Sequence, residues 1–166
     1  MRTIRFKGKR PDNGGWVYGS FYEDGDTVYM FGRCREMSMC GNIAFSVDRE
    51  TVCQFTGLLD KNGKKIYEGD VLRCNKYPFG FVDEEDNMCD NYYGVMVWNK
   101  ATASFCITTV KNPESSLEDI FEGKIYFIYQ DELKKSFEVV GNIHEPEWKQ
   151  YGEYIQTKEG KEAEDD

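Results

Sequence analysis

Short segments in which apolar and polar side chains alternate recur along the chain, separated by Gly, Asn, Asp or Pro residues. A period of two places successive side chains on opposite faces of an extended backbone, so this pattern predicts many short β-strands. The segments that show it are residues 3–7, 16–22, 27–31, 43–47, 51–55, 71–74, 93–98, 104–110, 125–129 and 137–143. We therefore expect a mainly β fold.

Turn residues predict how some of these strands connect. Asp24-Gly25 favours a tight type I′ turn, and Asn62-Gly63 favours a hairpin in which both residues adopt a positive φ. Gly69 permits a backbone conformation closed to other residues, and the Asp70 carboxylate can accept hydrogen bonds from nearby amides. Because a Gly-Asp turn before an apolar strand is a common opening of SH3-like barrels, we expect a barrel of about five strands between Asp70 and Asn142.

The helical patterns are short. Ser115 and Glu118 have the spacing of a capping box before an apolar stripe, which predicts one short helix. Pro146-Glu147-Trp148 favours one more helical turn. The expected fold is thus mainly β, with a small SH3-like barrel, additional N-terminal strands and one or two short helices.

Composition and turn positions divide the chain into three expected parts. Residues 1–56 are expected to form an N-terminal β segment with an aromatic-rich hairpin. Residues 57–150 are expected to form the SH3-like β-barrel, with a long acidic loop over residues 75–91. Residues 151–166 are polar and acidic, so we expect a disordered acidic tail.

The formal net charge is -9, and the acidic loop at residues 83–90 and the tail from Glu153 onward hold all of the excess. Such a chain is not expected to bind nucleic acid through its overall field, because phosphate binding needs clustered positive charge. The first ten residues are basic and contain no acid, which leaves a local exception open. The interpretation we prefer is a strand with Ile4 and Phe6 inward and with Arg5 and Lys7 in solvent.

The first residues, MRTIRFKGKR, contain no apolar core of a signal peptide, and the longest apolar run is too short for a membrane span. We therefore expect a cytoplasmic protein that makes no membrane contact. The six cysteines include no C-x-x-C pair, and the chain has one histidine, so we expect no metal and no cofactor. Cys53 and Cys106 lie in strand-like segments and are expected to be small buried side chains.

Three groups of residues are candidates for sites of chemistry. The acidic cluster 83–90 could bind Ca²⁺ or serve a metal-assisted hydrolase, but it lacks the EF-hand pattern, and a solvated loop explains it better. Glu68 and Asp70 could form an acid–base pair, although Gly69 between them favours a turn. His144 could pair with Cys53 or Cys106, but no motif places them together. No catalytic, cofactor-binding or metal residue is therefore assigned, and we expect no enzymatic activity.

Aromatic side chains are dense in the first third of the chain: Trp16, Tyr18, Phe21, Tyr22, Tyr29 and Phe31. Core packing is expected to use about half of them, as is usual for aromatic residues in strands. The others could stack on nucleic-acid bases or line an interface between copies. Because no lysine lies on the same segment, the interface is favoured.

Three blocks of sequence resemble one known family. Residues 54–71 (QFTGLLDKNGKKIYEGDV) look like the central motif of the YopX family, and IRFKGKRPDNGGWVYGSF and VVGNIHEPEW resemble its two ends in the right order. The resemblance implies a mostly β protein of phages or bacterial prophages, with an SH3-like barrel element and homo-oligomers. It implies no established activity and no functional residues. His144 stands where an aromatic residue is usual, which puts any role of this imidazole in doubt.

These observations together favour a phage or prophage accessory protein without enzymatic activity. We expect a β module that assembles with itself or binds a host protein in the bacterial cytoplasm. The alternative is a nucleic-acid-binding module that uses the basic N-terminus and a face of the barrel.

Overall fold

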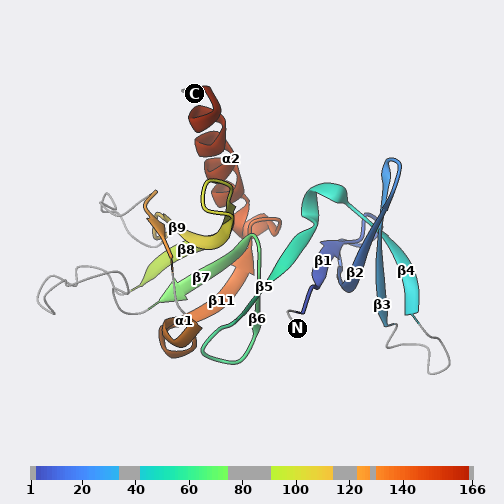
Figure 1. Cartoon of the computed structure of the whole chain (residues 1–166), viewed down its shortest axis with the longest axis horizontal. Helices are drawn as coiled ribbons and strands as arrows, with labels where there is room; N and C mark the ends of the chain where they lie inside the picture. The colour runs from blue at the N-terminus through green and yellow to red at the C-terminus, as the bar shows by residue number, and fades with distance from the viewer. Residues whose placement is uncertain (1–2, 34–41, 75–90, 114–122, 128–129, 165–166) are drawn as a thin grey trace, which may run out of the picture. The chain divides into compact units, whose positions relative to one another are not determined.

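The computed structural model describes residues 3–33, 42–74, 91–113, 123–127 and 130–164 (Figure 1). The chain divides into two compact units, Met1–Gly57 and Leu58–Asp166, and each is described by itself. The described residues form two antiparallel sheets and two helices, so the prediction of a mainly β fold is confirmed. The predicted capping-box helix and the acidic cluster 83–90 lie outside the described residues.

The first unit is a meander of strands. Its elements are β1 (Phe6–Lys9), β2 (Trp16–Asp24), β3 (Thr27–Arg33), β4 (Asn42–Val47), a 3₁₀ turn (Arg49–Thr51) and β5 (Cys53–Leu59). The strand order is β4-β3-β2-β1-β5, and β6 (Lys65–Tyr67) continues the sheet beside β5 after the division at Gly57. Val28, Met30 and Val47 are the buried apolar cluster of this unit, with Phe6, Val17 and Val52 packed against it.

The turn between β2 and β3 differs from the type I′ turn that we expected. Asp24 pairs with Thr27, which leaves Gly25 and Asp26 as a two-residue loop. Gly25 has φ 57°, whereas Asp26 is not among the described residues with positive φ. A positive φ at the first central position alone is the pattern of a type II′ turn, which has the same strand-compatible twist.

The expected exposure of the first strand is right for Phe6, which packs against the buried cluster, but wrong for Ile4 and Lys7. Ile4 is 65% exposed and Lys7 only 6% exposed, although we expected Ile4 inward and Lys7 in solvent. The reason is that β1 is an interior strand, with Lys7 paired to Tyr18 on one side and to Cys53 on the other. The aliphatic stem of a lysine can be buried by such neighbours while its ammonium finds a polar or aromatic contact.

The second unit is a sheet covered on both faces. Its strand order is β10-β9-β8-β7-β11, formed by β7 (Asp70–Cys74), β8 (Tyr92–Asn99), β9 (Ser104–Val110), β10 (Ile125–Tyr126) and β11 (Phe137–Asn142). Helix α1 (Gln130–Ser136) precedes β11, and a 3₁₀ turn (Pro146–Trp148) leads into helix α2 (Lys149–Glu164). The helical turn predicted at Pro146-Glu147-Trp148 is therefore confirmed.

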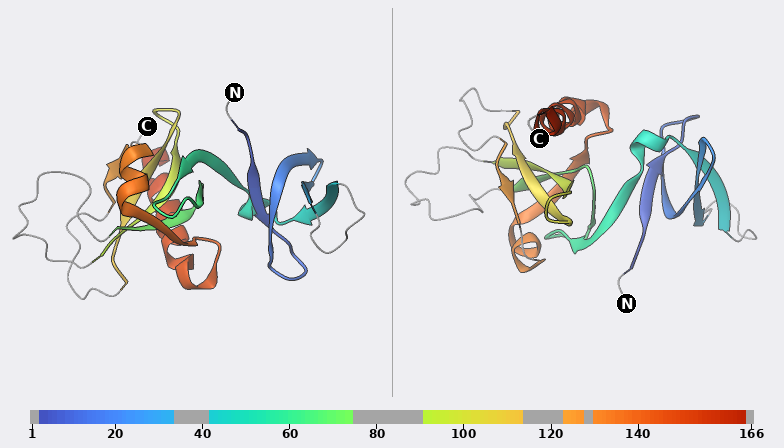
Figure 2. Two further views of the ribbon diagram at one scale, coloured as in Figure 1. Left: turned by 90° about the horizontal axis from the view of Figure 1, so that it is seen from below. Right: turned by 45° about the horizontal axis from the view of Figure 1, so that its top comes forward.

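Alternation along the strands sends side chains to two separate clusters. Leu72, Met96 and Ile107 pack with Leu133 of α1 and with Ile66 of β6. Val71, Val95 and Val110 pack with Tyr151 and Ile155 of α2, which lies along the other face of the sheet (Figures 1 and 2). In the described residues β10 and β11 are the two edges of this sheet and do not pair with each other, so the expected closed SH3-like barrel is not observed.

Helix α2 corrects the expectation of a disordered tail over residues 151–166. Tyr151 and Ile155 are four residues apart, so they share one face of a helix, and both are buried against the sheet. The Tyr151 hydroxyl also donates a 2.6 Å hydrogen bond to the Lys111 carbonyl. Two apolar residues make too short a stripe to stand out in a polar sequence, but they are enough to dock a helix. Across the described residues, no helix combines the length and apolar character needed to span a bilayer.

Candidate functional site

One face of the sheet in the first unit carries exposed aromatic side chains. Directly paired residues of antiparallel strands point to the same face. The register pairs Lys7 with Tyr18, Lys9 with Trp16, Ser20 with Phe31, and Tyr22 with Tyr29. We call this the aromatic face: Lys7, Lys9, Trp16, Tyr18, Tyr22, Tyr29 and Phe31. Tyr18, Tyr22 and Phe31 are 53%, 52% and 41% exposed.

The aromatic face contains five of the six aromatic residues singled out from the sequence. Phe21 differs, because it pairs with the buried Met30 and lies on the core side, with its ring centroid 5.3 Å from that of Phe6. On the aromatic face, the Tyr22 and Phe31 rings meet edge to face with centroids 6.3 Å apart. The chain thus presents large apolar rings on the side of the sheet opposite its buried cluster.

Two lysines lie beside these rings, which the sequence argument missed. The ammonium groups of Lys7 and Lys9 lie 4.5 Å and 5.5 Å from the centroid of the Trp16 ring. A cation over an indole face is attracted by the ring quadrupole. The lysines are not on the aromatic segment itself, but pairing of β1 with β2 brings them there. The alternation of Lys7 and Lys9 with Gly8 was the available signal.

The edge of the same sheet is open at β4. In the part of the chain that the structure describes, β4 pairs with β3 and with no other strand. Its sequence, NIAFSV, contains neither a charged residue nor proline. Charged side chains and proline are the usual means by which natural proteins prevent an edge strand from pairing with another chain. We call Asn42–Val47 the open edge.

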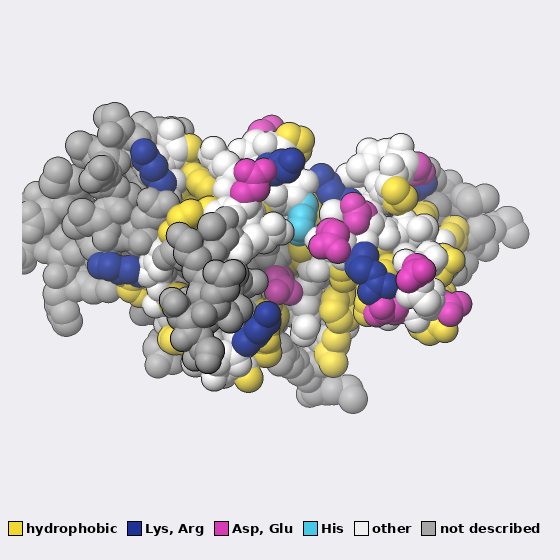
Figure 3. Space-filling view, turned by 90° about the horizontal axis from the view of Figure 1, so that it is seen from above, with side chains coloured by type: hydrophobic (Ala, Val, Ile, Leu, Met, Phe, Trp, Pro, Cys, Tyr) yellow, Lys and Arg dark blue, Asp and Glu magenta, His cyan; other side chains and the backbone are white. Residues whose placement is uncertain are grey.

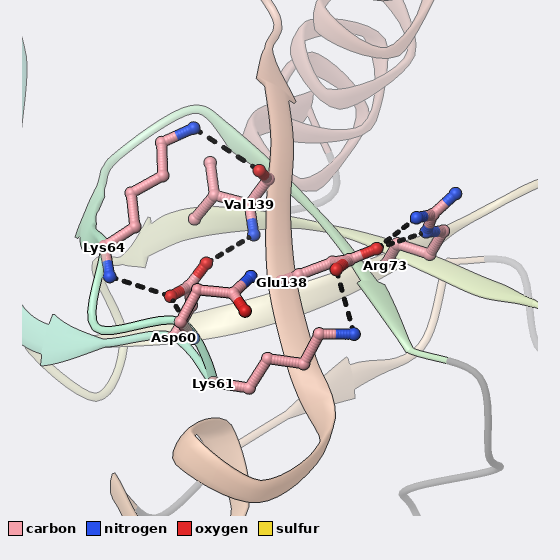
Figure 4. Close-up of polar contacts among 7 residues, drawn as sticks. Asp60, Lys61, Lys64, Arg73, Glu138 and Val139 are labelled. Atoms are coloured by element: carbon pink, nitrogen blue, oxygen red, sulfur yellow. Dashed lines mark hydrogen bonds and ion pairs between the residues drawn. The ribbon is translucent and has the colours of Figure 1, made fainter.

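The edge at β11 in the second unit is covered instead. The Lys61 amide donates a 2.8 Å hydrogen bond to the Phe137 carbonyl. The Val139 amide donates to Asp60 Oδ2 at 3.0 Å, and Lys64 Nζ donates to the Val139 carbonyl at 3.3 Å. The hairpin between β5 and β6 therefore binds outer backbone groups of β11, and Figure 4 shows the two contacts to Val139.

Asp60 holds that hairpin in shape as well. Its Oδ1 accepts the amides of Asn62 and Lys64, each at 2.8 Å, and its side chain is almost fully buried. Gly63 has φ 76°, whereas Asn62 is not among the described residues with positive φ, so the expected pair of positive-φ residues is wrong. Instead, the Gly63 amide donates a 3.0 Å hydrogen bond to the Asp60 carbonyl, and Gly63 itself has the left-handed conformation. A turn that ends in one left-handed residue is the usual form of a three-residue hairpin loop.

Glu138 is the centre of a small ion-pair group on β11 (Figure 4). It accepts from Lys61 Nζ at 2.9 Å and from Arg73, whose Nε lies at 2.7 Å. The hydrogen bond from Lys61, followed by that from Arg73, lowers the pKa of the Glu138 carboxyl below its ordinary value. Arg73 lies on β7 and Lys61 in the β5–β6 hairpin, so the two ion pairs connect both elements to β11.

The pair Glu68 and Asp70 does not form a free acid–base site. Asp70 Oδ2 accepts the Tyr67 amide at 2.8 Å, and Oδ1 accepts Asn142 Nδ2 at 3.0 Å, so the predicted role in binding nearby amides is confirmed. Gly69 has φ 72°, its amide donates to the Met96 carbonyl, and its carbonyl accepts the Ile143 amide. This corner joins β7 to the end of β11.

The cysteine and histidine candidates lie in separate places. Cys53 is buried in the first unit, where its thiol contacts the Thr51 carbonyl at 3.3 Å. Cys106 is buried in β9, and burial raises the pKa of its thiol, which disfavours the thiolate. The prediction that both cysteines are buried is confirmed. His144 lies in the turn after β11, where its backbone amide donates to Asn142 Oδ1 at 3.0 Å.

No group of three or more His, Cys, Asp or Glu residues suited to a metal ion occurs in the described ranges. On the face drawn in Figure 3, acidic and basic side chains of the described residues are interspersed, with apolar side chains among them. The features that stand out for binding are thus the aromatic face and the open edge of the first unit.

Comparison with protein families matches the chain to the family described as YopX protein over residues 11–147. No curated protein matches the chain. Among solved structures, the crystal structure of protein EF1440 from Enterococcus faecalis is similar with a TM-score of 0.45 and 16% sequence identity. The similarity covers 87% of this chain and 95% of that chain.

Proposed function

Because the chain belongs to the YopX family, whose function is unknown, we propose a function from its surface: a non-enzymatic β module that assembles with copies of itself. The observation that carries the proposal is the aromatic face of the first unit, which lies next to an uncharged open edge. Packing of copies on the aromatic face would remove its rings from water, and strand pairing at the open edge would satisfy its backbone groups.

Energetics favour an interface at this surface. Tyr18, Tyr22 and Phe31 are each roughly half exposed, and large aromatic side chains contribute most to binding when they become buried. Aromatic residues are enriched in the cores of protein interfaces, whereas charged residues are depleted there. A host protein is a second candidate partner for the same surface, and its binding would be competitive with self-assembly.

Light scattering coupled to size-exclusion chromatography tests the assembly. The full chain should elute as a multiple of the chain mass at tens of micromolar, and a strict monomer there would refute the proposal. Tyr18→Ser combined with Tyr22→Ser should weaken assembly severalfold. Ile125→Ser combined with Phe127→Ser is the matched control, because it removes two exposed apolar side chains from the second unit.

One observation favours nucleic-acid binding as a second candidate function. Lys7 and Lys9 flank Trp16 on the aromatic face, and Tyr18 lies beside them. Rings that stack on bases, next to cations that contact phosphates, are the elements of a single-strand binding surface. Titration of fluorescently labelled single-stranded DNA at low salt tests this: binding should fall steeply as salt rises, and no binding at low salt would exclude it.

We also propose the finer features that the resemblance implies. The second unit would be a relative of SH3-like barrels, a proposal supported by the Gly69 corner at the start of β7 and by the β7–β8–β9 meander. An experimental structure in which the two edges of this sheet pair with each other would establish closure. The protein would be encoded by a phage or prophage and act in the bacterial cytoplasm, which immunoblotting of fractionated lysogens can test.

A further inference from the structure

We propose that the open edge, Asn42–Val47, pairs antiparallel with the same strand of a second copy, about a two-fold axis through Phe45. The proposal rests on the proposed self-assembly and identifies the strand and register through which it occurs. The pairing would join two β4-β3-β2-β1-β5 sheets into one continuous sheet.

The contrast between two edges supports the choice of β4. At β11, three groups of the Asp60 hairpin bind the outer backbone atoms of the strand, so that edge cannot accept another strand. At β4, no described residue binds the outer backbone of Asn42–Val47 itself, and this stretch is six residues long; directly after it, the Asp48 amide donates to the Lys9 carbonyl at 2.8 Å. An open strand of this length presents a row of amide and carbonyl groups that a further strand can satisfy.

The order of side chains along β4 makes the strand complementary to itself. Ile43, Phe45 and Val47 pair with Gly32, Met30 and Val28, so they lie on the core side of the sheet. Ala44 and Ser46 lie on the side of the aromatic face, paired with Phe31 and Tyr29. An antiparallel partner keeps both faces matched only if apolar residues lie opposite apolar residues.

A two-fold axis through Phe45 satisfies this condition over the whole strand. It places Phe45 opposite its own copy, Ile43 opposite Val47 of the partner subunit, and Ala44 opposite Ser46 of the partner subunit. An axis between Ala44 and Phe45 would instead set the core side of one copy against the aromatic face of the other. An axis through Ala44 keeps the faces matched but leaves Val47 without an apolar partner.

Burial along β4 fits this arrangement. Val47 is buried, whereas Ile43 and Phe45 are half-buried on the core side, where the Arg10 guanidinium lies 5.3 Å from the centroid of the Phe45 ring; a second copy would bury both side chains further. Ala44 and Ser46 are exposed and small, which lets a second strand approach. Tyr29 and Phe31 on the neighbouring strand would then become part of an aromatic surface shared by both copies.

A charge exchange at the two exposed positions tests both the strand and the register. In Ala44→Lys/Ser46→Lys, like charges face each other in two cross-strand pairs of the proposed register. In the matched Ala44→Glu/Ser46→Lys variant, opposite charges occupy the same positions. Sedimentation equilibrium should give a dimer dissociation constant that is at least about tenfold higher for the first variant than for the second. Like charges directly opposite each other destabilise a strand pair, whereas opposite charges stabilise it.

The outcomes separate this inference from the proposed function. If the unmodified chain is monomeric, self-assembly itself fails. If the chain assembles and the double-lysine variant assembles equally well, assembly uses another surface and the β4 pairing is wrong. If both variants are weakened and have the same dimer dissociation constant, the register through Phe45 is wrong. Hydrogen exchange of the unmodified chain gives an independent readout: amides of Asn42–Val47 should exchange more slowly at high protein concentration, and unchanged exchange would overturn the pairing.

Discussion

Asp60 connects the β5–β6 hairpin to the edge of the second sheet through one carboxylate. Both of its oxygens are occupied, one by two amides of its own turn and the other by the Val139 amide. A carboxylate is suited to this position because it can only accept, and it accepts at several lone pairs. At the scale of single residues, this side chain therefore determines whether β11 has a covered edge.

Replacement of Asp60 should destabilise the second unit. Asp60→Ala leaves three backbone donors without their acceptor, and we expect a loss of about 2–3 kcal/mol in the free energy of unfolding. Asp60→Asn keeps one acceptor oxygen, so its loss should be smaller. Urea unfolding measures both. Lys64→Met is the control, because it removes only the exposed ammonium contact to the Val139 carbonyl; an equal loss in this variant would contradict the role of Asp60.

The Glu138 group should make stability depend on pH. The pKa of the folded-state carboxyl lies below its ordinary value, so ionised Glu138 stabilises the fold at neutral pH. This stabilisation is lost as the pH falls through the folded-state pKa. Glu138→Gln should lower the free energy of unfolding by about 1 kcal/mol or less at neutral pH, since its partners are partly solvated. In acid, where Glu138 is protonated, the substitution should not change the free energy of unfolding. Unfolding of both proteins across this pH range measures the difference; a constant difference would refute the pairing.

Single residues show where sequence reasoning succeeds and where it fails. The roles of Gly69 and Asp70 were predictable because turn chemistry is local. Asn62 was misjudged because the Asp60 side chain, two residues earlier, determines the turn type. Lys7 was misjudged because its burial depends on β2 and β5, which pair with it from distant parts of the chain. Alternation identifies a strand but does not say which face is covered.

At the scale of elements, the packing of the 3₁₀ turn on β11 depends on a glycine, Gly141, which has no side chain. Trp148 lies against Gly141 and between the rings of Tyr93 and Tyr151, whose centroids are 6.0 Å and 5.8 Å from its own. A Cβ built on Gly141 would lie 2.0 Å from Trp148 Nε1, which is far closer than any real contact. The Trp148 indole can therefore pack here only because residue 141 is glycine.

Two glycine-to-alanine variants should therefore have opposite effects. Gly141→Ala must displace Trp148 and should lower the free energy of unfolding by about 1–3 kcal/mol, the usual cost of overpacking. Gly152→Ala lies in α2, where a Cβ would meet Ile143 at 3.4 Å, and should stabilise by up to about 1 kcal/mol through helix propensity. Thermal unfolding followed by circular dichroism measures both. Equal effects of the two variants would show that Trp148 does not depend on the space at Gly141.

The elements themselves were predictable to different degrees. Alternation located the long strands β2, β3, β8 and β9, since each has a clear period of two. Helix α1 is not predicted, because Leu133 is the one residue of its segment, among those whose side chains the structure describes, that enters the core cluster. Helix α2 is missed for a similar reason: its composition is polar, and it is held by packing of Tyr151 and Ile155 on the sheet and by the bond from the Tyr151 hydroxyl to the Lys111 carbonyl.

At the scale of the whole molecule, the two units have unequal cores. The buried cluster of Met1–Gly57 consists of Val28, Met30 and Val47, whereas Leu58–Asp166 has two larger clusters, one on each face of its sheet. A domain of roughly 60 residues buries only about 60% of the surface of its unfolded chain and is marginally stable. We therefore expect the first unit to unfold before the second.

Pairing through β4 would compensate for this small core, which yields a prediction for the intact chain. A partner that binds only the folded state stabilises it by mass action, so the unfolding midpoint of the first unit should rise with protein concentration. Each kcal/mol that dimerisation adds to the free energy of unfolding should raise that midpoint by about 4–8 °C in a domain of this size. The midpoint of the second unit should stay constant, because the proposed pairing uses only β4 of the first unit.

Hydrogen exchange with mass spectrometry, applied during heating, resolves the two transitions by following β3 and β8 separately. In Ala44→Lys/Ser46→Lys the midpoint of β3 should no longer depend on concentration, while in Ala44→Glu/Ser46→Lys the dependence should persist. If β3 and β8 lose protection together at every concentration, the units unfold as one and the small core of the first is not the weaker one. If β3 responds to concentration in all three proteins, the stabilising contact lies outside β4.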